Sequence, residues 1–111
     1  MNKELRIEIA RLVADLSAGR YSELEADGRA GRLSAKELRT AVDQYGRTLV
    51  LLPDASWDLM DEYPQADARN TVAVDVPLWT KEEGRSDLTL SLTATKEADR
   101  WVLRVDDLHV L

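Results

Sequence analysis

Residues 70–110 read NTVAVDVPLWTKEEGRSDLTLSLTATKEADRWVLRVDDLHV, and this stretch decides the fold. Apolar and polar residues alternate in three successive runs within it. Because side chains on a β-strand point to opposite faces in turn, each run predicts a strand with one apolar face. The runs are separated by polar turn residues, which is typical of an antiparallel meander. We expect its strands at about 70–79, 87–95 and 100–110.

The residues before this stretch favour helices. Apolar residues recur every three or four positions near the N-terminus, and Gly19 follows as a stop signal. Ser34 and Glu37 have the spacing of a capping box, which begins a further helix. The expected helices are at about 2–18, 21–26 and 34–45. Between them, the sequence DGRAGR at 27–32 lacks the residues of a phosphate-binding loop and is interpreted as a solvated loop.

A fourth strand is expected at about 48–52, where a short apolar run with β-branched residues ends at Pro53. Residues 54–69 fit neither the helical nor the strand period, and Pro64 interrupts them, so the segment allows a short strand or a turn of helix. Helices followed by an antiparallel sheet predict an α+β fold in which the helices cover the apolar face of the sheet. At 111 residues, the chain is expected to form one domain, 1–111.

The composition excludes several classes of protein. The chain has no cysteine and one histidine, His109, so it cannot form a disulfide, a thiolate metal site or a multi-histidine metal centre. No stretch approaches the roughly 18 apolar residues that span a bilayer, and the N-terminal residues do not resemble a signal peptide. We therefore expect a cytoplasmic protein with no membrane segment, no metal and no cofactor.

Charge is distributed unevenly along the chain. Residues 1–47 contain nine basic and eight acidic residues, a net charge of +1, whereas residues 48–111 contain six and thirteen, a net charge of −7. Such an acidic half repels a phosphate backbone, so no nucleic-acid partner is expected. The same charge favours a basic protein partner.

The alternation also predicts which residues lie opposite one another. Placing apolar residues opposite apolar residues sets Val76 beside Leu90 and Leu90 beside Val105. The other face of the sheet then carries a polar cross-strand row, flanked by Thr89 and Thr93. The members of the row are Asp75, Ser91 and Arg104.

This polar row has two interpretations besides a solvated surface. It is a candidate binding face, and it is also a candidate interface for a two-fold homodimer. A catalytic triad is not predicted, because no histidine is expected near Ser91 on this face.

The last strand allows two arrangements. If alternation continues beyond Trp101, Asp107 and His109 point toward the helices, where the carboxylate would orient the imidazole as a general base in a pocket. If Asp106 and Asp107 form a bulge, Leu108 and Val110 enter the core and His109 is exposed. The bulge is favoured, because burying two apolar side chains stabilises the fold whereas burying an Asp–His pair is costly.

Other residues are candidates for contact with a partner. Trp79 ends a predicted strand on the side opposite the core, next to the acidic pair Glu82 and Glu83 in the following turn. An exposed tryptophan beside an acidic loop is typical of an interaction site, although a half-buried edge tryptophan is more common.

Three segments carry a resemblance to a known family. They are PLWTKEEGRSDLTL at 77–90, YGRTLV at 45–50 and the ending DDLHVL at 106–111. The chain resembles a family of short bacterial proteins that is common in actinobacteria and implies no known activity. Its order of elements is also similar to the cystatin-like cone of the nuclear-transport-factor-like superfamily, which implies a curved sheet behind N-terminal helices. Such folds host enzymes, ligand-binding proteins and interaction modules alike.

Two functional hypotheses follow. The first is a non-enzymatic, cytoplasmic interaction protein whose acidic sheet half binds a basic protein, in the manner of small immunity or regulatory proteins. The second is a small-molecule-binding or enzymatic domain that uses Asp107 and His109 in a pocket.

Overall fold

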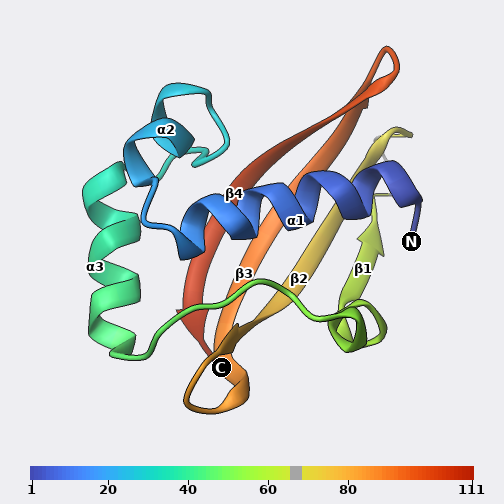
Figure 1. The fold of residues 1–111 in the computed structure, drawn as a ribbon. Helices are drawn as coiled ribbons and strands as arrows, with labels where there is room; N and C mark the ends of the chain where they lie inside the picture. The colour runs from blue at the N-terminus through green and yellow to red at the C-terminus, as the bar shows by residue number, and fades with distance from the viewer. Residues whose placement is uncertain (66–68) are drawn as a thin grey trace.

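The computed structural model describes residues 1–65 and 69–111, and it places helices on one side of a four-stranded sheet (Figure 1). The strands are antiparallel, in the order β1-β2-β3-β4. The α+β class predicted from the sequence is confirmed. In chain order, the elements are α1 (Lys3–Ser17), α2 (Tyr21–Ala26), α3 (Ala35–Tyr45), the 3-10 helix η1 (Asp54–Leu59), β1 (Asp61–Pro64), β2 (Thr71–Thr80), β3 (Gly84–Glu97) and β4 (Arg100–Val110).

Helix α1 crosses one face of the sheet and buries its apolar side against it (Figure 1). The Asn2 side chain begins the helix by accepting a hydrogen bond from the Leu5 N–H at 3.1 Å. Each apolar side chain of the helix that becomes buried contributes roughly 1.5–3 kcal/mol. The buried residues are Leu5, Ile9, Leu12, Val13 and Leu16. No helix in the described ranges has both the length and the apolar character needed to cross a membrane.

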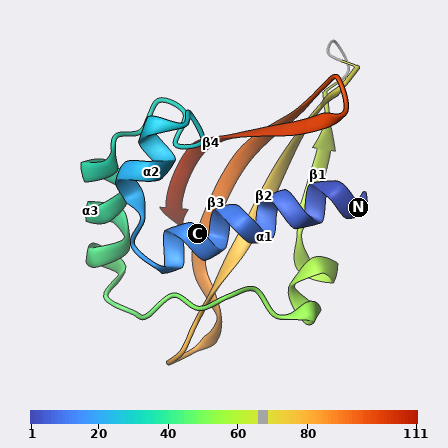
Figure 2. The same cartoon turned by 45° about the horizontal axis from the view of Figure 1, so that its top comes forward.

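Helices α2 and α3 lie beside the C-terminal end of α1 (Figure 2). The predicted capping box at the start of α3 is confirmed: the Glu37 N–H donates to the Ser34 hydroxyl, and the Ser34 N–H donates to the Glu37 carboxylate, both at 3.0 Å. The helix ends at Gly46, whose φ of 75° is the left-handed conformation that terminates helices. Local signals in the sequence therefore fix both ends of α3.

Segment 48–52 is not a strand, contrary to the prediction. It makes a single bridge, between Leu49 and Thr80, at the end of β2. The neighbouring edge of β2, residues 72–75, is already paired with β1. The burial of the run also does not follow a strand period, because Leu49 is buried while Leu51, two residues on, is 66% exposed.

The fourth strand is instead β1, in the region for which the sequence made no prediction. Its residue Pro64 lies opposite Val72. Proline lacks an N–H donor, and β1 is an edge strand, so its outer side requires no donor. The proline that obscured this strand in the sequence is therefore compatible with it.

Strands β2 and β3 pair in the predicted register, with Val76 opposite Leu90. The predicted register of β3 and β4 is wrong, since Leu90 lies opposite Leu108 and Val105 lies opposite Leu92, two residues further along β3. The pairing shifts at the doubled acidic residues, where β4 contains the extra residue Asp106. This is the bulge favoured by the sequence, and it changes every pairing between the bulge and the end of β4.

A second irregularity lies near the start of β3, where the pairing with β2 shifts between Pro77 and Trp79. The buried Ser86 stabilises it, because its hydroxyl donates to the Leu78 carbonyl at 2.8 Å and accepts from the Leu88 N–H at 3.2 Å. The side chain thus replaces ladder hydrogen bonds that the irregularity interrupts.

The segment 27–32 is a turn region with four exposed residues, as the prediction of a solvated loop requires, but it is also packed against β4. Ala30 is fully buried, and the Arg29 carbonyl accepts a hydrogen bond from the Val105 N–H at 2.8 Å. Gly31 has a φ of +63° and lies so close to Val105 that a Cβ atom would collide with its carbonyl oxygen. Glycine is therefore required there for both conformation and space.

Candidate functional site

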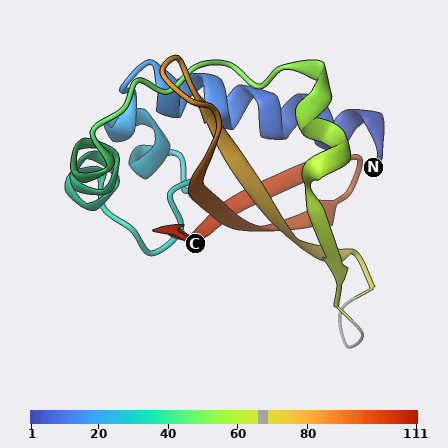
Figure 3. The ribbon, with the colours of Figure 1, turned by 90° about the horizontal axis from the view of Figure 1, so that it is seen from below.

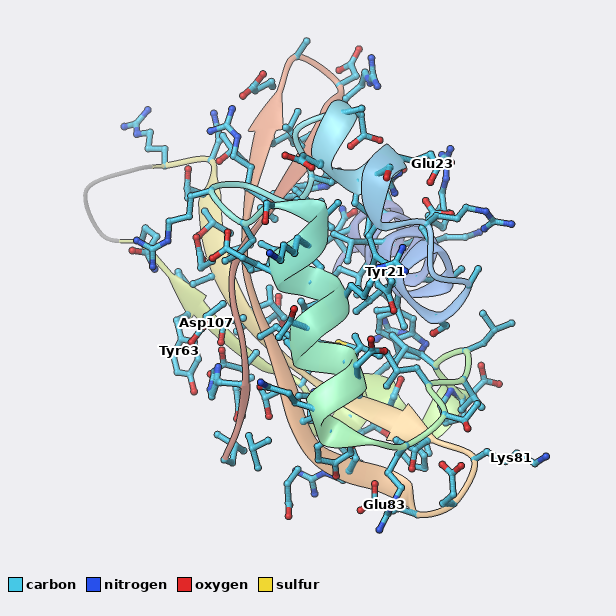
Figure 4. All side chains as sticks on the ribbon, turned by 90° about the vertical axis from the view of Figure 1, so that its left-hand side faces the viewer. Tyr21, Glu23, Tyr63, Lys81, Glu83 and Asp107 are labelled. Carbon is cyan, nitrogen blue, oxygen red and sulfur yellow. The ribbon has the colours of Figure 1, made fainter. Side chains whose placement is uncertain are left out.

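The sheet face opposite α1, termed the outer face, carries polar side chains and has no described helix over it (Figure 3). A cross-strand row runs through all four strands on this face, from Asp61 through Asp75 and Ser91 to Asp107. In Figure 4, Tyr63 and Asp107 lie on the side of the sheet away from α1. The row therefore presents three carboxylates and one hydroxyl.

The predicted row of Asp75, Ser91 and Arg104 is correct in its first two members. Arg104 lies opposite Thr93 instead, and Asp107 occupies the place that the prediction gave to it. Two causes combine. The β3–β4 turn is shorter than predicted, with Glu97 opposite Arg100, which shifts the register by two residues, and the bulge at Asp106 adds one more. The row is consequently more acidic than the sequence predicted, although Arg104 still lies on the outer face.

Two hydroxyl groups on this face donate to carboxylates. The Ser91 hydroxyl donates to Asp75 Oδ1 at 2.7 Å, and the Thr93 hydroxyl donates to Asp106 Oδ2 at 2.6 Å. The Ser91 hydroxyl thus donates to a carboxylate, whereas the hydroxyl of a serine nucleophile donates to an imidazole base. The arrangement orients the acidic side chains rather than activating Ser91.

Asp107 and His109 do lie together, but on the outer face. His109 Nδ1 is 3.1 Å from Asp107 Oδ2, although the geometry is not that of a hydrogen bond. The other oxygen, Asp107 Oδ1, accepts from the Leu108 N–H at 2.9 Å. His109 is opposite Thr89 and Asp107 is opposite Ser91, so the expectation of no histidine near Ser91 on this face is wrong.

The sequence predicted that a bulge would bury Leu108 and Val110 and expose His109, and the structure agrees in part. Leu108 is buried at 8% exposure, as expected, whereas Val110 is 57% exposed. His109 is half-buried, with 36% of its side chain exposed. Val110 lies at the end of β4, opposite the buried Leu88.

Tyr63 is a residue of the outer face that the sequence did not identify. It lies on β1 opposite Ala73, and 49% of it is exposed. The Asp61 carboxylate raises the pKa of Tyr63 above its usual value, with smaller effects from desolvation and from Asp75. The pKa of the Tyr63 phenol therefore depends on the negative charge of the row.

Trp79 is half-buried on the outer side of the end of β2. Its ring packs near Gly84, and its indole Nε1 is buried without a hydrogen-bond partner in the described chain. The burial of Trp79 therefore matches that of a half-buried edge tryptophan rather than that of a fully exposed contact residue.

Glu82 and Glu83 have partners within the chain. Glu82 accepts from both the N–H and the hydroxyl of Thr48 at 2.8 Å, and these hydrogen bonds lower its pKa. Glu83, at the lower end of the molecule in Figure 4, accepts from the Tyr45 hydroxyl at 2.9 Å and the Thr80 hydroxyl at 3.1 Å. Both residues therefore connect the β2–β3 turn to the segment around α3, and their role in binding stays a prediction.

A groove of about 550 Å³ lies on the other side of the molecule, between α1 and β4. Its walls are the exposed side of α1, the segment 27–29 and residues 99–104. The sequence could not identify this groove, because it joins three segments that are far apart in the chain.

One side of this groove is held in place by Arg29. Its guanidinium contacts Asp15 and Asp27, each at 2.8 Å. The hydrogen bond from Arg29 lowers the pKa of Asp27. Burial opposes ionisation of Asp15, but hydrogen bonds from Arg29 and Arg20 outweigh it and lower the pKa of Asp15 as well. The ion pairs fix the segment 27–29 to the end of α1.

The described residues contain no group of three or more potential metal ligands close enough to hold an ion.

A family model described as "Domain of unknown function (DUF7668)" matches residues 13–111. No curated protein and no solved structure matches the chain significantly.

Proposed function

We propose a function from the residues of this chain, which belongs to the DUF7668 family, a domain of unknown function. The chain is a non-enzymatic binding protein whose outer face docks a protein with a basic contact surface. One observation carries this proposal. Three carboxylates, on Asp61, Asp75 and Asp107, form a row across a sheet face that no described helix covers.

The distribution of charge supports this proposal. The acidic half of the chain, residues 48–111, contributes all three carboxylates of the row and also Asp106. A cluster of carboxylates attracts a basic protein surface over distances of about 10 Å at 0.1 M salt, which accelerates association. Association should therefore be fast at low salt and slower at high salt.

Two aromatic residues on the outer face add apolar contact area to the charge of the acidic row. Tyr63 is half exposed on β1, and Trp79 is half-buried at the far end of β2. Aromatic side chains provide much of the affinity at protein interfaces, whereas charges mainly determine association rate and partner choice. A basic surface with apolar positions is thus the complementary partner.

The test compares two pairs of neutralising substitutions. Asp61→Asn with Asp107→Asn removes two charges from the outer face and keeps the hydrogen-bond acceptors. Glu23→Gln with Asp43→Asn removes two exposed charges on the helical side. A partner is captured from the native host, and its association rate with each purified variant is measured at low and high salt.

The outer-face pair should slow association about tenfold at low salt and have little effect at high salt. The helical pair should leave the rate close to that of the wild type. If both pairs have equal effects, or if salt does not change the rate, the outer face is not the docking surface.

A second candidate function has one observation in its favour, the 3.1 Å separation of His109 Nδ1 and Asp107 Oδ2. A carboxylate that orients an imidazole is the arrangement of a general base in a ligand-binding or enzymatic domain. The pair lies outside the helix-covered space, so a ligand would have to bind on the outer face. An NMR titration of His109 in the wild type and in Asp107→Asn tests this. An identical titration in both rejects the pair as a functional unit.

Homodimerisation through the outer face is a further proposal for the same surface. It would set carboxylates of one copy against those of the other, so it requires screening by salt.

The cytoplasmic location, the bacterial family common in actinobacteria and the cone-type architecture stay predictions from the sequence.

A further inference from the structure

The free edge of β4 carries an inference beyond the outer face. Strand β4 ends the sheet, and on its free side the Val105 N–H donates to the Arg29 carbonyl. Hydrogen-bonding direction alternates along a strand, so the N–H and C=O groups of Trp101 and Leu103 also point away from β3. Within the described ranges, these edge groups have no hydrogen-bond partner. Unpaired strand edges are templates for a further strand.

The groove described above lies along this part of the edge. Residues 99–104 form one wall, α1 forms the opposite wall, and segment 27–29 lines the groove beside them. Ile7 on α1 is 49% exposed, and Trp101 is half-buried with an unpartnered Nε1. A strand added to β4 would therefore place every second side chain against apolar residues.

The side chains on the other face of β4 define the charge of the occupant. Arg100 and Arg104 are exposed, stand four residues apart and point to the same face. The groove also contains four carboxylates, on Glu4, Glu8, Asp27 and Asp99. Glu8 pairs with Arg11 and Asp27 pairs with Arg29, the other two arginines of the groove. Neither Arg100 nor Arg104 has a carboxylate within 4.0 Å in the part of the chain that the structure describes. Opposite positions on adjacent strands bring Cβ atoms to about 5 Å.

We propose that the free edge of β4 binds an extended acidic segment of another protein as a fifth strand. The segment has acidic residues at two positions four apart, which meet Arg100 and Arg104. Its two intervening inward positions are apolar and contact Trp101 and Ile7. Main-chain hydrogen bonds to Trp101 and Leu103 supply the pairing, and the segment needs about five residues, or roughly 17 Å.

A second copy of β4 fits this edge less well. The antiparallel pairing that uses the free groups of both Trp101 and Leu103 places Val102 on the two-fold axis. Arg100 of one copy would then lie opposite Arg104 of its partner, and directly opposed like charges destabilise a strand pair. The charge pattern therefore favours an acidic segment over self-association.

The probe is the peptide SDVTVDS, capped at both ends. Two matched peptides accompany it: SKVTVKS, which reverses the charges, and SDVTVDS methylated on the two valine amide nitrogens, which face β4. Binding to the full chain is followed by NMR shifts and by hydrogen exchange of the Trp101 and Leu103 amides. Arg100→Gln with Arg104→Gln provides the matched protein variant, and its amide spectrum verifies that it is folded.

The Trp101 and Leu103 amides should become protected by SDVTVDS. The N-methylated peptide should bind about tenfold more weakly, because it lacks two hydrogen bonds. SKVTVKS should bind about fivefold more weakly than SDVTVDS, and the double arginine variant should abolish this preference.

Three results would overturn the proposal. They are equal binding of the N-methylated peptide, a charge preference that persists in the double arginine variant, and dimerisation of the free chain that protects the same two amides. The pair Asp61→Asn with Asp107→Asn should bind SDVTVDS as the wild type does. Failure of this inference and failure of the acidic docking face are therefore separate results.

Discussion

At the scale of single residues, Gly31 illustrates how close backbone packing holds the segment after α2 against β4. A side chain at this position meets two obstacles, a left-handed φ and the Val105 carbonyl oxygen. Gly28 in the same segment also has a positive φ, of +88°, but its missing Cβ would contact nothing within 4 Å. A side chain at Gly28 would therefore cost only conformational free energy, whereas one at Gly31 would also collide with Val105.

We predict that Gly31→Ala destabilises the fold by about 3 kcal/mol, since both costs apply. Gly28→Ala should cost about 1–2 kcal/mol, because conformation alone applies. Urea unfolding of both variants measures the difference. Equal losses would show that segment 27–31 moves away from β4 without cost.

The pKa of Tyr63 reports the electrostatic potential on the outer face. Asp61 raises its pKa because a neighbouring carboxylate disfavours the phenolate, so Asp61→Asn should lower the pKa toward the usual value. Tyr21, on the helical side in Figure 4, is a control within the same molecule, because burial is the main cause of its raised pKa.

NMR titration of labelled tyrosines distinguishes these two residues. Added salt should move the pKa of Tyr63 toward its usual value and change that of Tyr21 much less, because salt screens charges and does not reverse burial. A pKa of Tyr63 that is insensitive to both Asp61→Asn and salt would remove the electrostatic argument for the outer face.

At the scale of elements, the irregular start of β3 depends on one buried hydroxyl. We predict that Ser86→Ala destabilises the protein by about 1–3 kcal/mol, because the Leu78 carbonyl and the Leu88 N–H lose their partner. The exposed Ser22→Ala should change stability by less than about 0.5 kcal/mol. Thermal unfolding of both variants tests this, and a tolerated Ser86→Ala would mean that backbone or water replaces the hydroxyl.

The elements differ in how well their sequences predict them. Helix α3 has a complete local signature, from Ser34 to Gly46, and it was predicted closely. Strand β1 has none, because it is short, exposed and ends at Pro64, and only its pairing with β2 makes it a strand. Segment 48–52 shows the reverse case, in which an apolar run has β propensity but makes only one bridge to β2, at Thr80.

The candidate site was predictable on β2 and β3 but not on β4. The pairing of Asp75 with Ser91 follows from unbroken alternation, and the structure confirms it. The partner of Ser91 on β4 depends on the length of the β3–β4 turn, which moves it from Arg104 to Asp106, and on the bulge, which moves it on to Asp107. Tyr63 and the groove beside α1 depend on contacts between distant segments, which periodicity does not encode.

At the scale of the whole molecule, the net charge of −6 affects self-association. We predict a mass near 12.5 kDa by light scattering at low salt, because pairing through the outer face would oppose its carboxylates. Any dimer through this face should strengthen with salt and with Asp75→Asn plus Asp107→Asn. A stable dimer at low salt that these substitutions leave unchanged would place the interface elsewhere.

The strand order β1-β2-β3-β4 also determines how the chain is assembled during synthesis. Every strand pairs with its neighbour in sequence, so each hairpin can form rapidly once its second strand is available. Helix α1 is made first, yet the sheet face that buries it is completed only when β4 has been synthesised. At typical translation rates this interval is on the order of ten seconds. Throughout it, the apolar side of α1 is open to chaperones and to other nascent chains.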